Sequence, residues 1–141
     1  MKHGYGVYTW ADGSEFKGNW ENNKITGFGT YYWEDGRTYE GFWKDNNMHG
    51  EGTYKWPDQR EYKGQYVEDK KEGFGVYRYP DGRCYKGMWK AGRQHGEGIF
   101  ITPNGEEKRG EWKDGKRLYW LDDGQNSEFN KSDVLVNGGP P

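Results

Sequence analysis

The chain has little of what builds an ordinary globular core, since its 141 residues include one cysteine, five prolines and only three leucines. The single cysteine, Cys84, cannot form an internal disulfide, which excludes a disulfide framework and favours a reducing compartment. The sequence has no apolar run near the roughly 20 residues that span a bilayer, and no signal-peptide core at its start. We therefore expect a soluble intracellular protein.

The chain also lacks an excess of charge of either sign. A formal net charge of -2 and a pI near 5.9 give no general attraction to nucleic acid, so we expect no nucleic-acid partner. Hydrophobic residues make up 30% of the chain and charged residues 31%, which argues against a thick two-layer core. Aromatic residues reach 18%, far more than disordered chains carry, so we expect a thin, aromatic apolar surface.

A pattern with a period of 23 residues fills most of the chain. Each unit has a Gly-x-Gly, then an Asp-Gly, then an aromatic-x-Gly-x-aromatic segment. The Gly-x-Gly pairs are Gly4/Gly6, Gly27/Gly29, Gly50/Gly52, Gly73/Gly75 and Gly96/Gly98. Regular repeats without insertions indicate an array in which each unit stacks on its neighbours.

Each unit is predicted to be a β-hairpin, because segments rich in aromatic residues and Thr are bounded by Gly and Asp-Gly. Helix is disfavoured by three regularly placed glycines in each unit. The repeated residues are two apart in each strand, so they share one face of the sheet. We predict that Trp10 pairs with Phe16, that Tyr8 faces Gly18 and that Gly6 faces Trp20, across a loop of odd length. In that register each aromatic ring covers a glycine on the opposite strand.

The remaining segments are given simpler roles. We expect the opposite face of the sheet to be solvent-exposed, with some apolar spots, and residues 21–26, 44–49 and 90–95 to link the hairpins. The pattern fails after Lys116, where Tyr119-Trp120-Leu121 is predicted to cover the open edge of the last hairpin. The rest is predicted to be a tail, with Val134-Leu135-Val136 as a short strand or partner-binding element. Because the pattern is already running at Met1-Lys2-His3, we expect a longer parent chain.

No catalytic or metal site is predicted. His3, His49 and His95 recur 46 residues apart, about 19 Å per step in a hairpin array, which is too far for a shared metal ion. Cys84 has no predicted histidine partner and is interpreted as a passive thiol. The Gly-x-Gly segments lead into strands, whereas phosphate-binding loops lead into helices, so no nucleotide cofactor is expected.

The repeated pattern resembles the MORN repeat (membrane occupation and recognition nexus) over about residues 3–118. The resemblance implies an all-β, single-layer antiparallel β-hairpin solenoid. Five repeats are expected within 1–118, at 4–26, 27–49, 50–72, 73–95 and 96–118, followed by a C-terminal cap and tail at 119–141. The fifth repeat is degenerate, with Thr102, Asn104 and Lys108 at pattern positions, and Gln59 replaces a turn glycine in the third.

The resemblance also implies a non-catalytic scaffold or adaptor in a cytoskeletal, ciliary or membrane-cortical assembly of the cytoplasm. The aromatic face is predicted to bind a protein partner, or a second copy of the chain, since Tyr and Trp dominate interface hot spots. A homodimer through the C-terminal end is a second expectation. The predicted partner-binding residues are Tyr31, Trp33, Tyr39, Trp43, Tyr54, Trp56, Tyr62, Tyr66, Tyr77, Tyr79, Tyr85 and Trp89.

Two other classes of function remain open from the sequence. The alternative to protein binding is weak attachment to anionic lipid such as phosphoinositide headgroups, through aligned basic residues. These are Lys24, Lys63, Lys70, Lys86, Arg93 and Lys116. An enzyme is conceivable only if the chain is a fragment of one.

Overall fold

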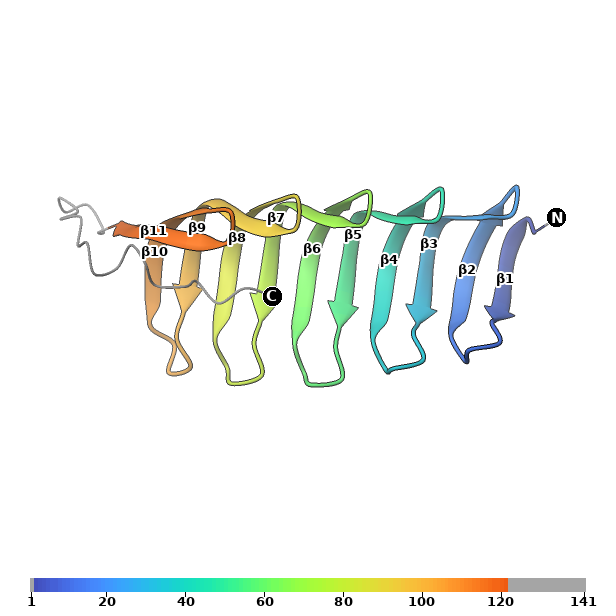
Figure 1. The fold of residues 1–141 in the computed structure, drawn as a ribbon, viewed down its shortest axis with the longest axis horizontal. Helices are drawn as coiled ribbons and strands as arrows, with labels where there is room; N and C mark the ends of the chain where they lie inside the picture. Colours follow the sequence, from blue (N-terminus) through green and yellow to red (C-terminus); the bar gives the residue numbers. More distant parts are fainter. Residues whose placement is uncertain (1, 122–141) are drawn as a thin grey trace. The chain divides into compact units, whose positions relative to one another are not determined.

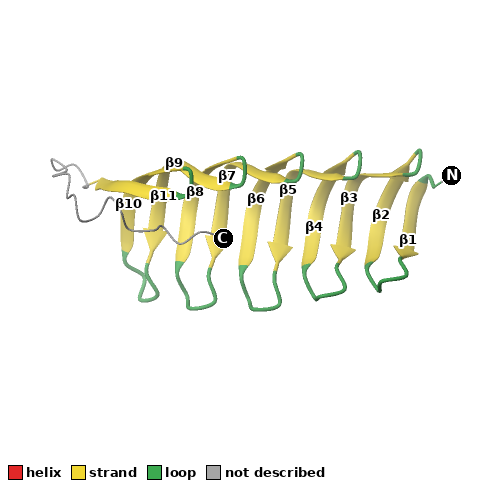
Figure 2. Cartoon of the chain, in the orientation of Figure 1, coloured by secondary structure: helices red, strands yellow, loops and turns green. Residues whose placement is uncertain are grey.

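In the computed structural model, which describes residues 2–121, these residues form strands, turns and no helix (Figures 1 and 2). The eleven strands of this part are β1 (Gly4–Thr9), β2 (Glu15–Glu21), β3 (Lys24–Tyr32), β4 (Thr38–Lys44), β5 (Asn47–Lys55), β6 (Glu61–Val67), β7 (Lys70–Arg78), β8 (Cys84–Lys90), β9 (Arg93–Ile101), β10 (Glu107–Lys113) and β11 (Lys116–Leu121). Their order in the open antiparallel sheet is their order in the sequence, which confirms the predicted fold class. The chain divides into two compact units, Met1–Lys70 and Lys71–Pro141.

The Asp-Gly segments form the turns of the predicted hairpins. In the first, the Trp10 N–H donates to the Ser14 carbonyl oxygen at 2.9 Å, and the Gly13 N–H donates to the Trp10 carbonyl oxygen at 3.0 Å. Three residues therefore close the loop, and Gly13 adopts a φ of 96°, in the left-handed region. The predicted odd loop length is confirmed.

The predicted register is wrong by two residues. Tyr8 pairs with Phe16, not Gly18, and Gly6 pairs with Gly18, not Trp20. Trp10 lies at the mouth of the loop opposite Ser14, because the loop is two residues shorter than the predicted pairing required. Glycine therefore faces glycine across the hairpin, while the predicted shared face of the repeated residues is retained.

The segments predicted to link one hairpin to the next do link them, and they form second hairpins of paired strands. Strand β2 runs to Glu21, which pairs with Lys24 at the start of β3, so only two residues make the turn. The equivalent turns are Asn22-Asn23, Asp45-Asn46, Glu68-Asp69, Ala91-Gly92 and Asp114-Gly115. Their non-glycine residues all have φ between 47° and 73°, as the type I′ turn requires at both positions.

Each long strand is bent (Figure 1), and the bend lies at the first glycine of its Gly-x-Gly. Gly27 adopts a φ of 72° and Gly50 a φ of 93°, which L-residues with a side chain seldom tolerate. Register shifts lie beside them, between Gly18 and Trp20 and between Gly41 and Trp43. Bulges of this kind bend a strand and increase its twist, so the two arms of each repeat enclose an angle over the aromatic face.

In later pairs the second glycine serves a different purpose, because at Gly29, Gly52 and Gly98 an aromatic ring lies on it. In the first unit the paired glycines Gly18 and Gly29 lie under the ring of Phe16. A Cβ built at Gly18 would stand 2.6 Å from Phe16 Cζ and 2.6 Å from the Gly29 Cα. The expectation that rings cover glycines is confirmed, but Phe16, Tyr39 and Tyr85 cover glycines of their own strand and of the next hairpin.

The covering rings form the core together with the last aromatic of each pattern unit. Phe16 meets Trp20 edge-on at 5.5 Å and, in the next repeat, Trp43 at 5.6 Å, with interplanar angles of 89° and 87°. Tyr39 is placed in the same way between Trp43 and Tyr66, at 5.1 and 5.4 Å. Each edge-to-face pair contributes about 0.5–1.5 kcal/mol beyond the apolar area it buries. A chain of perpendicular rings thus joins the repeats of the first unit.

In the second unit the same arrangement reaches β11. Tyr85 meets Trp89 at 5.4 Å and Trp112 at 4.8 Å. The cluster predicted to cover the last hairpin does cover the edge of β10, as a further strand in which Trp120 pairs with Gly110. The predicted tail, including Val134-Leu135-Val136, lies outside the described residues 2–121.

Candidate functional site

A continuous line of aromatic rings crosses the first unit on the inner side of its bent strands. We call it the ring row. Trp10 and Trp33 each pack against the Tyr before them and the Tyr of the following repeat, and Trp56 packs against Tyr54, with successive ring centroids 4.4–5.3 Å apart. Its members are Tyr8, Trp10, Tyr31, Trp33, Tyr54 and Trp56.

The twelve aromatic residues predicted to bind a partner separate into two groups by their burial. Nine are buried in the ring core of their unit: Tyr39, Trp43, Tyr54, Tyr62, Tyr66, Tyr77, Tyr79, Tyr85 and Trp89. Tyr31, Trp33 and Trp56 are half-buried and keep part of each ring in contact with solvent. Tyr8 and Trp10 in the first repeat are half-buried too, so the accessible aromatic surface extends to the start of the array.

An arginine from each of three loops lies over the ring beside it. The Arg37 Nε bonds the Asp35 carboxylate at 2.8 Å, and its guanidinium carbon lies 5.0 Å from the Trp33 ring centroid. An NH1 hydrogen of Arg37 is donated to the Tyr54 hydroxyl at 2.8 Å. The backbone N–H and the side chain of Arg37 lower the pKa of Asp35, while burial raises the pKa of Tyr54. The loop thus holds Trp33 and Tyr54, inside the ring row, in place.

The same arrangement recurs in the next two loops. Arg60 bonds Asp58 at 2.8 Å, and its guanidinium carbon lies 4.9 Å from the Trp56 ring centroid. In the second unit, Arg83 bonds Asp81 at 2.8 Å and lies 4.5 Å from the Tyr79 ring centroid. Because each arginine is paired with the aspartate of its own loop, these cations add little net charge to the aromatic face.

A pocket of about 340 Å³ opens at the start of the ring row, where the first two repeats meet. Rings line one side of it, and residues of the two-residue turns line the other. The lining residues are Lys2, Tyr8, Trp10, Trp20, Asn23, Ile25, Tyr31, Trp43 and Asn46. The Lys2 ammonium lies 4.3 Å from the Tyr8 ring centroid and 5.3 Å from that of Trp20, within reach of cation–π attraction.

The comparisons with known proteins settle the family. The family model for the MORN repeat matches residues 1–15, 16–36, 39–59, 62–82, 85–107 and 109–117, which is most of the chain. The chain belongs to the MORN-repeat family. The family's repeats are typically non-catalytic. The search of curated proteins returned no match.

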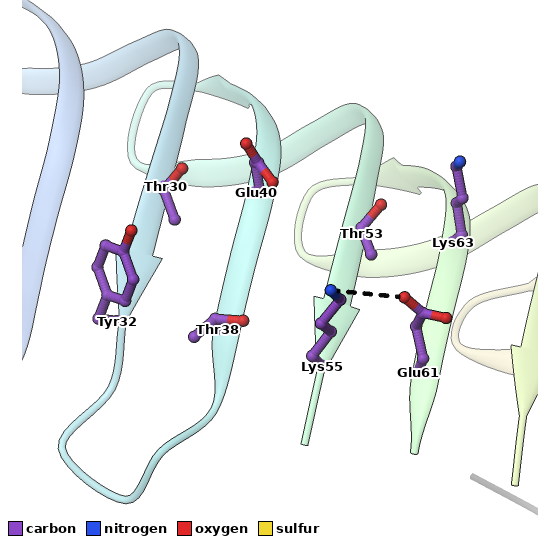
Figure 3. Close-up of a pocket in the computed structure, with 8 residues that line it drawn as sticks. All are labelled: Thr30, Tyr32, Thr38, Glu40, Thr53, Lys55, Glu61 and Lys63. Atoms are coloured by element: carbon purple, nitrogen blue, oxygen red, sulfur yellow. Dashed lines mark ion pairs between the residues drawn. The ribbon is translucent and has the colours of Figure 1, made fainter. Parts of the chain in front are cut away.

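The outer face of the MORN sheet carries a shallow polar depression in the first unit (Figure 3). It measures about 330 Å³, and residues of four neighbouring strands line it: Thr30, Tyr32, Thr38, Glu40, Thr53, Lys55, Glu61 and Lys63. Lys55 and Glu61 approach within 3.9 Å of each other, as the dashed line in Figure 3 shows. Two lysines and two glutamates leave this depression without a net charge that would select a ligand.

The basic residues of the lipid alternative lie on two different parts of the MORN array. Lys24, Lys70, Arg93 and Lys116 are exposed where the two-residue turns enter the next strand. Lys63 and Lys86 instead lie in the middle of β6 and β8, next to outer-face residues such as Gln65 and Met88. The structure therefore separates the six residues into a turn set and an outer-face set.

In the MORN repeats, His49 and His95 contact turn residues, and Cys84 is buried. The Nδ1 atoms of His49 and His95 accept weak hydrogen bonds from turn N–H groups at 3.4 and 3.5 Å, those of Glu68 and Asp114. Cys84 is buried, and burial raises the pKa of its thiol. Across residues 2–121 there is no group of three or more His, Cys, Asp or Glu side chains that could hold a metal ion.

Two further observations concern surfaces of the described residues. Several apolar side chains of the outer face are exposed, among them Tyr5, Phe28, Phe42 and Phe74, as expected for that face. The described residues include no helix whose length and apolarity would suit a membrane span.

The turn asparagines and Lys2 were not among the predicted site residues. Their segments carry no aromatic signal and were predicted to be linkers. Only the two-residue turns bring them across from the rings, and in the sequence the one available signal was the recurrence of Asn at positions 23 and 46, one repeat apart.

Proposed function

We propose that this MORN array is a non-catalytic scaffold that binds a segment of a partner protein along the ring row. The observation that supports the proposal is the accessible line of half-buried rings, Trp10, Tyr31, Trp33 and Trp56, beside a concave pocket. Partly exposed Trp and Tyr rings with polar edges are the side chains that most often dominate protein interfaces.

The packing under the ring row favours rigid presentation. Trp33 lies between Tyr31 and Tyr54, at 4.6 and 5.2 Å, and the Arg37 guanidinium lies over it. Rings held in this way lose little freedom when a partner covers them, so less of the binding free energy is spent on ordering side chains. An extended or helical segment could contact several rings at a low entropic cost.

The chemistry of the one thiol agrees with a non-catalytic role. A nucleophilic cysteine needs a lowered pKa and an adjacent base, whereas burial raises the pKa of Cys84. The Arg78 NH1 lies beside it, 4.0 Å from the sulfur. MORN repeats often bind proteins or membranes, and we place this chain in the protein-binding class, within a cytoskeletal, ciliary or cortical assembly.

A homodimer through the C-terminal end forms part of the proposal. Strand β11 (Lys116–Leu121) pairs with β10 on one side, and within residues 2–121 it is the last strand of the sheet. The backbone of such an edge strand invites antiparallel pairing with a second copy. Light scattering at several protein concentrations measures the oligomeric state directly.

The test of the proposed function selects short random peptides, displayed on phage, on the immobilised full chain. The affinities of the selected peptides are then measured for three proteins: the wild type, the double variant Trp33→Ala with Trp56→Ala, and the double variant Lys70→Glu with Arg93→Glu. We expect the ring variant to lose at least about tenfold in affinity, as removal of hot-spot side chains does, and the charge variant to bind nearly as the wild type does. Near-ultraviolet circular dichroism and melting temperature show whether each variant is folded.

A parallel arm measures co-sedimentation with vesicles that contain phosphoinositide. If no peptide is selected, and vesicles bind the wild type but not the charge-reversal variant, the lipid alternative replaces the proposal. If the charge reversals damage peptide binding more than the ring removals do, the ring row is not the binding surface.

A further inference from the structure

Around the pocket in the first unit, the asparagine side chains use their acceptor oxygens in bonds to the backbone but not their donor nitrogens. In the two-residue turns, the Asn46 N–H donates to the Ile25 carbonyl oxygen at 3.0 Å, and the Ile25 N–H donates to the Asn46 Oδ1 at 2.8 Å. Asn23 bonds Lys2 by the same two contacts. Because a backbone N–H can only donate, the amide oxygen of each Asn must face the backbone. The Nδ2 group of each Asn, which is a donor, takes no part in these two bonds.

The turns themselves do not require asparagine. Asp69 occupies the equivalent position one repeat after Asn46, with a φ of 70° against 73°. Its N–H donates to the Met48 carbonyl oxygen at 2.9 Å, and its Oδ1 accepts from the Met48 N–H at 2.7 Å. A carboxylate thus makes the same two bonds. The amide nitrogens of Asn23 and Asn46 are therefore surplus to the fold, and both residues line the pocket.

Apart from the Tyr8 and Tyr31 hydroxyls, which can donate as well as accept, the other polar side chains of the lining are donors. The Lys2 ammonium is a donor only, and so is the Trp10 indole N–H. The Trp43 indole N–H is donated to the Gly29 carbonyl oxygen at 3.1 Å. The lining contains no Asp or Glu side chain. The pocket therefore combines an aromatic wall with a rim that offers hydrogen-bond donors and one positive charge.

We propose that this pocket recognises an acidic residue next to an apolar residue in the partner segment. The carboxylate meets Lys2 and the amide nitrogen of either Asn23 or Asn46, which stand one repeat, roughly 9–10 Å, apart, while the apolar side chain packs on Trp10 and Tyr31. This inference rests on the proposed function, because it assigns the chemistry of the partner that the ring row binds. Hydrogen bonds to a charged group contribute more to binding than neutral ones, so the carboxylate is the feature that selects the partner.

A cationic partner residue fits the pocket less well. Two of the rings that would attract a cation, Tyr8 and Trp20, already have the Lys2 ammonium over them. A second cation would be repelled by Lys2 and would find no carboxylate in the lining.

The test uses Asn46→Asp, which keeps the turn and replaces the surplus donor by an anion. Asp69 shows that aspartate serves at this turn position, so the variant is expected to keep the melting temperature of the wild type. Asn47→Asp is the matched control, because it adds the same charge one residue further on, outside the pocket lining. Both variants are measured with the phage-selected peptides and with synthetic copies in which each Glu or Asp becomes Gln or Asn.

We expect the selected peptides to be enriched in Asp or Glu beside an aromatic or aliphatic residue. Asn46→Asp should weaken binding of an acidic peptide about tenfold, Asn47→Asp should weaken it much less, and the neutral copies should bind weakly to all three proteins. Selection of peptides without acidic residues, or equal binding of acidic and neutral copies, overturns the inference. If such neutral peptides still depend on Trp33 and Trp56, the proposed function survives. If no selected peptide depends on those rings, the proposed function fails as well.

Discussion

The ring of Tyr39 lies flat on Gly52, a glycine of the following repeat, and closes the space in which a side chain would stand. The Tyr39 hydroxyl donates to the Phe42 carbonyl oxygen at 3.0 Å, which holds the ring in this position. Tyr85 makes the same contact with Gly98, and its hydroxyl donates to the Met88 carbonyl oxygen at 2.9 Å. One tyrosine thus links two repeats within each unit, so this contact transmits order along the array.

Replacement of Gly52 by alanine should be strongly destabilising. The added methyl group would overlap the ring of Tyr39, which is fully buried, and overpacking of this kind costs about 1–3 kcal/mol. Gly6→Ala is the matched control, because Gly6 is the same glycine of the first repeat and a methyl carbon there would meet nothing nearer than Trp20 Cδ1, at 3.7 Å. Urea unfolding of both variants measures the difference, and similar losses in the two would refute the role given to Tyr39.

The fold could be predicted from the sequence because the period of 23 residues places the same residues at the same positions in every hairpin. The alternation of Gly4, Gly6 and Tyr8 along one strand also predicts the shared face correctly. The register could not be derived in this way, since the pairs Tyr8–Phe16 and Tyr8–Gly18 both keep that face and differ only in loop length. The hydrogen bonds between Trp10, Gly13 and Ser14 decide between them.

The candidate site was only partly predictable. A pattern identifies Trp33 and Trp43 equally as aromatic, yet Trp33 is half-buried while Trp43 is 7% exposed. Trp43 lies on the turn side of the bend, where the rings of Phe16, Tyr31 and Tyr39 pack against it, whereas Trp33 lies at the loop end of its hairpin. The pocket rim could not be found from sequence because Asn23 and Asn46 reach it only through turns that were predicted to be linkers.

Alkaline pH should unfold the protein through its buried tyrosines. Burial raises the pKa of Tyr39 and Tyr85 well above the ordinary 10, and raises that of Tyr79 to about 12. Because the pKa in the folded state lies above that in the unfolded state, this contribution to stability is complete below about pH 10. It is lost as the pH rises through the higher folded-state values.

The absorbance of tyrosinate, followed against pH, measures this directly. We expect a group of tyrosines that ionises only above about pH 12, together with loss of the near-ultraviolet circular dichroism signal. In concentrated urea the same protein should show one transition near 10, the ordinary tyrosine value. A native protein whose tyrosines all titrate near this ordinary value would contradict the burial of these hydroxyl groups.

The amide of Gln94 should be replaceable by an apolar side chain with a gain in stability. Gln94 is fully buried, and neither atom of its amide has a hydrogen-bond partner among the described residues. The amide does lie near enough to the Tyr79 hydroxyl to oppose the effect of burial on the pKa of Tyr79, but the geometry falls short of a hydrogen bond. Burying polar atoms without partners costs about 1–3 kcal/mol, and the equivalent positions 69 and 46 residues earlier hold the apolar Ile25 and Met48.

We therefore expect Gln94→Met to raise the free energy of unfolding by about 1 kcal/mol, because methionine has a similar length and needs no partner for its side chain. The matched control is Gln65→Met on the exposed outer face of β6, where the same chemical change should leave stability within about 0.5 kcal/mol of the wild type. Urea unfolding followed by tryptophan fluorescence measures both variants. A loss of stability in Gln94→Met would mean that the amide's interaction with Tyr79 outweighs the cost of burying it, and that this glutamine is a polar link within the ring core of the second unit.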